Sequence, residues 1–260
     1  MSANLKSVAT PAVRERVSSE EWAVRVDLAA AYQLAAQFRW TDLIYTHFSA
    51  RVPGAEHFLI NAYGLMFDEI TASNLVKIDH AGKIIDDPTG LGYNEAGFVI
   101  HGCVHEARPE ISCVIHTHTR AGVAVSAQKC GLLPLSQHAT RVIAQLTYHD
   151  YEGIALEMDE RTRLARDLGP TSKAMILRNH GLLTAGESVR EAFELMYYLD
   201  CACQIQVDAL SGGVDNALLM SAQAARTAAE QFERPDRPSV HKDWPALLRL
   251  LDRKGVDYRS

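Results

Sequence analysis

The sequence contains no run of about 18 apolar residues, the length that a membrane-spanning helix needs. Its first ten residues lack the apolar core of a secretory signal. Basic residues number 26 against 32 acidic ones, and the net charge of -6 supplies no broad positive field for nucleic acid or an anionic membrane. These absences predict a cytoplasmic protein that binds small molecules, with no nucleic-acid or membrane partner.

Cysteine is scarce, and its number is odd. The five cysteines lie mostly within apolar segments, which predicts buried thiols and argues against a disulfide framework. Two of them, Cys201 and Cys203, would diverge on a helix, and no second pair exists to complete a zinc knuckle. The other three are Cys103, Cys113 and Cys130.

Three common catalytic motifs are absent. The chain has no Gly-x-Gly-x-x-Gly, no phosphate-binding Gly-Lys-Ser/Thr and no Gly-x-Ser-x-Gly. Nicotinamide, nucleotide and serine-hydrolase chemistry is therefore disfavoured.

The composition that is present, 47% hydrophobic and 22% charged over 260 residues, is that of one ordinary globular domain. We expect a flexible arm over residues 1–18 and a single domain over 19–260. Alternating apolar patterns predict strands at 43–52, 58–61, 75–79, 83–85, 113–118, 174–178 and 181–185. Helical spacing predicts helices at 18–38, 97–108, 119–129, 159–168, 188–210, 215–233 and 243–254, and thus an α/β fold with helices flanking a mixed sheet.

The apolar strand 113–118 ends in two histidines one residue apart. Alternate side chains of a strand leave the same face, so His116 and His118 would project together, with their roots roughly 7 Å apart. His180 also ends an apolar strand, and Gly181 after it permits a tight turn. Three imidazoles with a fourth position open are the ligand set of a catalytic zinc site.

Other residues compete for roles. His101 and His105 lie on one helix face and could also hold a metal, although the metalloprotease glutamate between them is missing. Glu95 precedes a helix and is either a general acid or base or only a cap, and His138 is either catalytic or a loop histidine. His47 is either part of the site or a hydrogen-bonded core residue.

These motifs together resemble the class II aldolase and adducin family. The similarity covers about residues 22–210 and is carried by Tyr-Thr-His-Phe-Ser-Ala-Arg (45–51), Val-Ile-His-Thr-His (114–118) and Asn-His-Gly (179–181). It implies a three-layer α/β/α domain around a mixed, largely antiparallel sheet, usually a homotetramer with active sites at subunit interfaces. It also implies a divalent metal on His116, His118 and His180, most often Zn²⁺, with Mn²⁺, Co²⁺ or Fe²⁺ as alternatives.

The chain departs from the sugar-phosphate aldolases of that family at two places. Thr46-His47 replaces their Gly-Asn, and Glu95-Ala96-Gly97 replaces their Ser-Ser-Glu, so the phosphate-binding serines are missing. His138 falls where those aldolases use a tyrosine of the neighbouring subunit. Adducin heads, the other branch, are structural and lack the metal histidines that this chain keeps.

The resulting expectation is a metal-dependent carbon-carbon lyase that acts on a small non-phosphorylated hydroxy or oxo acid by retro-aldol cleavage or decarboxylation. Glu95 or His138 would move the proton, and His47 and Asn61 would hold a carboxylate. Two alternatives stay open: an iron-dependent oxygenase on the same three histidines, and a non-catalytic adducin-like interaction module.

Overall fold

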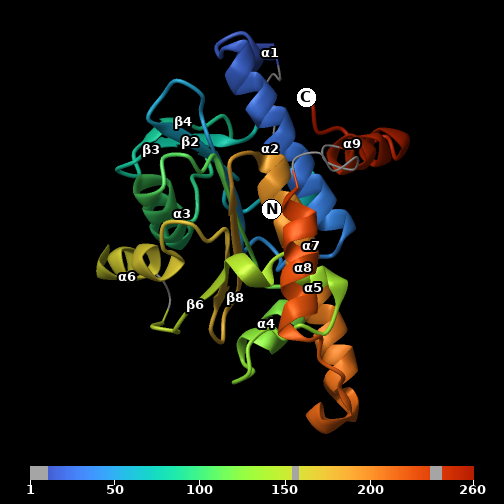
Figure 1. The fold of residues 1–260 in the computed structure, drawn as a ribbon. Helices are drawn as coiled ribbons and strands as arrows, with labels where there is room; N and C mark the ends of the chain where they lie inside the picture. Colours follow the sequence, from blue (N-terminus) through green and yellow to red (C-terminus); the bar gives the residue numbers. More distant parts are fainter. Residues whose placement is uncertain (1–10, 154–157, 235–241) are drawn as a thin grey trace.

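A computed structural model describes residues 11–153, 158–234 and 242–260, and their centre is one mixed β-sheet (Figure 1). Its strands are β1 (His47–Arg51), β2 (His57–Ile60), β3 (Val76–Asp79), β4 (Ile84–Asp86), β5 (Cys113–Thr117), β6 (Leu146–His149), β7 (Ala174–Leu177) and β8 (Gly181–Gly186). They are arranged in the order β4-β3-β2-β1-β5-β8-β7-β6. Every pair is antiparallel except β6 and β7, which run parallel.

Helices cover both faces of the sheet. They are α1 (Pro11–Arg14), α2 (Ser19–Gln37), α3 (Glu95–Ala107), α4 (Arg120–Ser126), α5 (Gln137–Thr140), α6 (Met158–Leu168), α7 (Val189–Ala209), α8 (Ala222–Glu233) and α9 (Asp243–Arg253). Short 3-10 turns lie at Phe67–Glu69, Ile143–Gln145, Leu210–Gly212 and Val214–Asn216. In Figure 1, α3 and α6 lie on one side of the sheet and α2 and α7 on the other, which makes three layers.

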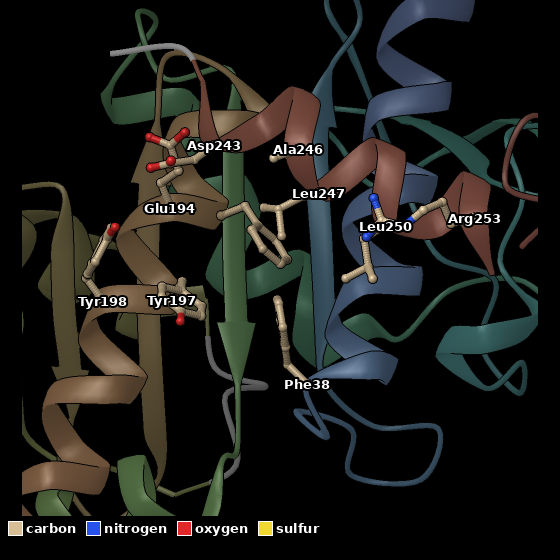
Figure 2. A pocket seen from close by; sticks show the side chains of 10 residues that line it. Phe38, Glu194, Tyr197, Tyr198, Asp243, Ala246, Leu247, Leu250 and Arg253 are labelled. Atoms are coloured by element: carbon tan, nitrogen blue, oxygen red, sulfur yellow. The ribbon is translucent and has the colours of Figure 1, made fainter. Parts of the chain in front are cut away.

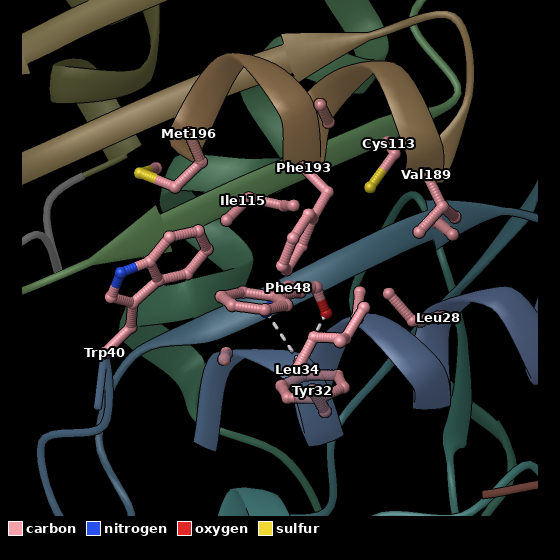
Figure 3. Packing of buried hydrophobic residues seen from close by; sticks show 14 of the residues in the cluster. Leu28, Tyr32, Leu34, Trp40, Phe48, Cys113, Ile115, Val189, Phe193 and Met196 are labelled. Carbon is pink, nitrogen blue, oxygen red and sulfur yellow. Dashed lines mark hydrogen bonds between the residues drawn. The ribbon is translucent and has the colours of Figure 1, made fainter. Parts of the chain in front are cut away.

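The core is divided by the sheet, as the alternation of β5 shows. Cys113 and Ile115 belong to the larger apolar cluster with Phe48 and Phe193, between the sheet and helices α2 and α7 (Figure 3). Val114 points the other way, into the smaller cluster that α3 and α6 cover. A strand that is buried on both faces reads as a continuous apolar run, which is the pattern of residues 113–115.

The predicted fold class, including the largely antiparallel mixed sheet, is confirmed. The predicted helix start at Ser18 and Ser19 is confirmed too, because the Ser18 side chain accepts a hydrogen bond from the Glu21 N–H at 3.1 Å. The strand predicted from Leu43 begins only at His47. Leu43 and Thr46 have left-handed φ angles of 50° and 68°, and the Tyr45 N–H bonds the Asp42 carbonyl, so this stretch is a turn.

Three other differences concern β6, α8 and the N-terminal arm. Residues 146–149, which lie in none of the predicted strands, form an edge strand because they pair with β7, a partner that local pattern does not reveal. The last-but-one helix begins at Ala222 rather than 215. Within the predicted flexible arm, residues 11–14 form α1 and Val13 is buried, while residues 1–10 lie outside the described part.

Candidate metal centre

His116, His118 and His180 converge at one point, where β5 ends and β8 begins. Their nearest ring nitrogens all lie within 4.8 Å of one another. The three ring centroids form a near-equilateral triangle with sides of 4.7, 4.8 and 4.8 Å. The structure thus brings together the three histidines that the sequence predicts as metal ligands. Among the residues described, this is the one group of three or more histidine, cysteine or acidic side chains found close enough to hold a metal.

Two of these rings are oriented from behind. The Nδ1 of His116 lies 2.9 Å from the carbonyl oxygen of Leu182, and the Nδ1 of His118 lies 2.9 Å from a carboxylate oxygen of Asp42. A carbonyl and a carboxylate can only accept, so both Nδ1 atoms carry the proton. Outer acceptors of this kind are what fix the tautomer of metal-binding histidines.

The two Nε2 atoms are consequently bare in the neutral rings, yet they face each other at 2.9 Å. Two lone pairs at that distance repel unless a cation or a proton lies between them. His116 is almost completely buried, and burial together with the nearby His180 lowers its pKa well below the usual range. Burial likewise lowers the pKa of His180 to about 4. A divalent cation held by all three rings would remove this repulsion, and three imidazoles are a donor set that suits such an ion.

The turn that carries His180 differs in detail from the expected one. Asn179, with φ 56°, takes the left-handed conformation, and the His180 N–H closes the turn on the Leu177 carbonyl at 3.1 Å. Gly181 has ordinary backbone angles, but a Cβ there would lie 2.4 Å from the Thr117 carbonyl oxygen. The glycine is needed because β8 approaches β5 closely beside the site.

A second group of buried polar side chains lies next to the first. The Nδ1 of His47 lies 2.8 Å from the Nε2 of His101, and the Ser49 hydroxyl lies 2.6 Å from the Nδ1 of His101 and 2.8 Å from the Nε2 of His105. The Nδ1 of His105 is 3.3 Å from the carbonyl of Ile111. His101 and His105 of α3 are therefore joined through the hydroxyl of Ser49 in β1, and they do not belong to the group of three converging histidines.

His47 connects the two groups. It pairs directly with His116 in the β1–β5 register, and the two ring centroids are 5.2 Å apart. Its ring packs against Gly97 in the first turn of α3, where a Cβ would come within 2.6 Å of it. Burial, followed by His101, lowers the pKa of His47 well below the usual range, so the ring is neutral at pH 7.

Comparison with known proteins identifies the family. The family model of the class II aldolase and adducin N-terminal domain matches residues 26–207. The chain belongs to the class II aldolase and adducin family. The predicted resemblance is thereby confirmed.

Three class II aldolase and adducin family relatives illustrate the range of the match. An aldolase II superfamily protein from Pseudomonas syringae is 57% identical, with a TM-score of 0.92 over 96% of this chain and 100% of that one. Mouse alpha-adducin is 45% identical over 91% of this chain, which spans 34% of the adducin. L-Fuculose 1-phosphate aldolase from Glaciozyma antarctica is 25% identical, with a TM-score of 0.82 over 93% and 94% of the two chains.

The remaining predicted site residues lie apart from the three converging histidines. Glu95 is the first residue of α3 and is exposed, one half-turn before the glycine that touches His47. His138 lies in α5, with its ring 6.0 Å from that of Tyr198 in α7, on the sheet face away from His116. Asn61 is buried beside the Tyr32 hydroxyl of α2, 2.8 Å away, also on that opposite face. Their predicted roles stay predictions.

Two residues that support the histidine groups, Asp42 and Ser49, were not predicted from the sequence. Asp42 supports His118 from the turn before β1, and Ser49 joins His101 to His105. The strand period alone would have placed Ser49 on the same face as His47, because the two residues are two apart. No spacing signal links Asp42 to a histidine 76 positions away.

A separate cavity of about 390 Å³ lies between α7 and α9 (Figure 2). Phe38 and Leu247 form part of its apolar wall, and the carboxylates of Glu194 and Asp243 lie together at one end. None of the three converging histidines lines it.

Among the described residues, no helix is both long and apolar enough to cross a membrane.

Proposed function

We propose that the protein is a metal-dependent carbon-carbon lyase that cleaves a small non-phosphorylated hydroxy or oxo acid, by retro-aldol cleavage or decarboxylation. The observation that carries the proposal is the convergence of His116, His118 and His180, in which two Nε2 atoms face each other at 2.9 Å while the Nδ1 atoms of the same two rings bond acceptors behind them. Family membership supports the same reaction class.

Zn²⁺ is the ion that we propose for the site, because three imidazole nitrogens are a preferred catalytic set for it. His116, His118 and His180 would hold the ion, and Asp42 would keep His118 in its binding orientation. When bound, the ion supplies Lewis acidity that stabilises negative charge developing on a substrate oxygen. The protein's own contribution is to fix three donors on rigid strand ends.

Proton transfer is assigned to Glu95 or His138. Glu95 is exposed at the start of α3, within one turn of the residue that packs on His47. His138 lies behind the sheet as seen from His116, so it can serve only the site of another subunit. If His138 is the proton carrier, the active protein must be an oligomer, and a homotetramer with interface sites is the assembly that we propose.

The substrate class follows from His47. L-Fuculose 1-phosphate aldolase, one of the related structures, acts on a phosphorylated sugar by its name. In this chain the corresponding strand start carries a buried, neutral imidazole, which offers no positive charge to a phosphate dianion.

The five free cysteines fit the reducing environment of a cytoplasmic enzyme.

A second candidate function is a non-catalytic interaction module, which the similarity to alpha-adducin favours. The two candidates differ in what they require of the three histidines. A lyase needs the ion for turnover, whereas a module would keep its fold and its interactions without one.

The deciding experiment is metal analysis of the purified protein, combined with an assay of aldehyde and CO₂ release from hydroxy-oxo acids and their phosphorylated counterparts. We expect close to one equivalent of zinc per chain and release from a non-phosphorylated acid. The double variant His116→Ala, His118→Ala should retain less than about a tenth of an equivalent and lose turnover.

His57→Ala is the matched control, because His57 is a partly exposed histidine at the start of β2, away from the site. It should keep both metal and activity. Turnover at an unchanged rate by the double variant, or by exhaustively chelated protein, would disprove the lyase. A folded chain that purifies without metal would favour the module.

A further inference from the structure

The buried chain from His105 to His47 has only one consistent direction of hydrogen bonding. It begins at the Ile111 carbonyl, which can only accept, so the Nδ1 of His105 must carry a proton. Burial, with Arg51 nearby, lowers the pKa of His105 to about 3, so this ring is neutral and its Nε2 is an acceptor. The His105 end of this series of hydrogen bonds is therefore fixed by a backbone carbonyl.

Each following bond is set by the one before. The Ser49 hydroxyl must donate its single proton to the Nε2 of His105, 2.8 Å away. Its oxygen then accepts from the Nδ1 of His101 at 2.6 Å, which leaves the Nε2 of His101 bare. That nitrogen in turn requires a donor, and the Nδ1 of His47 lies 2.8 Å from it.

We infer that this chain holds His47 as the Nδ1–H tautomer and presents its Nε2 as a hydrogen-bond acceptor beside the three converging histidines. His47 stands opposite His116 in the strand register, with ring centroids 5.2 Å apart, so the bare nitrogen is on the ring that adjoins the metal centre. Ser49 and His101 are positioning residues, because they act only through His47.

The inference rests on the proposed function in one respect, the identity of the group that His47 accepts from. A lone pair in a buried site attracts a hydroxyl and repels a carboxylate. His47 would therefore accept a hydrogen bond from a substrate hydroxyl beside the three converging histidines, rather than hold the carboxylate expected from sequence. The substrate is a hydroxy compound whose hydroxyl proton is needed for binding.

The tautomer can be measured without any substrate or metal. Long-range ¹H–¹⁵N correlation of labelled protein distinguishes a protonated from a bare ring nitrogen, and His47→Asn provides the assignment. We expect a protonated Nδ1 and a bare Nε2 for His47 in the parent protein. In Ser49→Ala, His101 can take either tautomer, so His47 should become a mixture of both.

Two serine variants separate this role from general packing. Ser126→Ala removes another buried hydroxyl, which donates to the Val123 carbonyl in α4, and should leave the His47 pattern unchanged. Ser49→Thr keeps the hydroxyl and should show the parent His47 pattern, which provides a test if Ser49→Ala disturbs folding. A protonated Nε2 on His47 in the parent protein, or an unchanged pattern in folded Ser49→Ala, would overturn the assignment.

The hydroxyl preference is tested with zinc-loaded protein and two probes, glycolate and methoxyacetate, which differ in the hydroxyl proton. Glycolate should bind about tenfold more tightly, the worth of one hydrogen bond, and Ser49→Ala should bring the two close to parity. Equal binding by the parent protein, or no glycolate binding at all, would refute the hydroxyl assignment. Failure of zinc loading would instead contradict the proposed function and leave the tautomer result standing.

Discussion

Two groups of histidines lie side by side in this molecule and use their nitrogens in opposite ways. In the buried chain of His47, His101 and His105, every close nitrogen contact pairs a donor with an acceptor. In the converging group, His116 and His118 turn two acceptors toward each other. The first arrangement is complete with protein atoms alone, whereas the second leaves ring nitrogens available to a cation.

The difference lies in what stands behind each ring. His118 is backed by the Asp42 carboxylate and His116 by a carbonyl, so their protons are held away from the site. His105 is backed by a carbonyl too, but its other nitrogen meets the Ser49 hydroxyl, which can donate. Proximity of three imidazoles therefore does not by itself indicate a metal site. What matters is which ring nitrogens carry a proton and which are left as acceptors.

The largest test of this comparison is pH. The hydrogen-bonded histidines His47, His101 and His105 must stay neutral. For one of them, His105, burial lowers the pKa from 6.5 to about 3. The unfolded state thus binds a proton that the folded state refuses, so this stabilisation is full above pH 6.5 and declines as the pH falls toward 3. The slope is roughly 1.4 kcal/mol per pH unit for one group, or about 3 kcal/mol between pH 6.5 and 4.5.

Urea unfolding across that range measures the effect. His105→Leu should flatten the dependence by about one proton, although its stability at pH 8 should be lower because Ser49 loses its acceptor. His57→Leu, which removes a partly exposed histidine outside the buried group, is the matched control for the substitution itself. An unchanged slope in His105→Leu would show that His105 is not held neutral by the fold.

The second test removes the carboxylate behind His118, one of the three proposed metal ligands. Asp42→Ala leaves the Nδ1–H of His118 without its acceptor, so the ring can rotate and its proton is free to change position. Loss of such an outer partner typically weakens metal binding by about 10- to 100-fold. Competition with a zinc chelator measures the affinity. Asp42→Asn keeps an acceptor but not the charge, so its zinc affinity should lie between those of the parent protein and Asp42→Ala. Parent-like affinity in Asp42→Ala would remove Asp42 from the metal centre.

Sequence alone predicted the converging group better than the chain beside it. His116 and His118 follow from strand alternation, a local rule, and His180 follows from a second strand end. Whether the two strand ends meet depends on β5 pairing with β8, and here the three-histidine pattern and family resemblance supplied what periodicity could not. The α/β class was predictable because the long elements have clear local periods, whereas the three-layer arrangement around a largely antiparallel sheet was implied by the family resemblance.

The chain beside the metal centre was not predictable because it crosses between elements. His101 and His105 share a helix face, which the sequence shows, but their partner Ser49 comes from β1, 52 and 56 positions away. The direction of the bonds depends on one backbone carbonyl at Ile111. β6 escaped prediction for a similar reason, because its partner is a strand 28 positions along the chain.

The smallest expected effect concerns Thr46, which leads into both groups. Its φ of 68° is rare for a β-branched residue, and its hydroxyl is buried without a hydrogen-bond partner. Thr46→Gly relieves both, so we expect the free energy of unfolding to rise by up to about 1 kcal/mol in metal-free protein, measured by urea titration. Asn179→Gly, at another left-handed position, should change stability by less than about 0.5 kcal/mol because asparagine tolerates that conformation. If Thr46→Gly instead destabilises the protein, the threonine packs favourably enough to outweigh its strain, and the turn before β1 is a structural support rather than a strained lead-in to the metal centre.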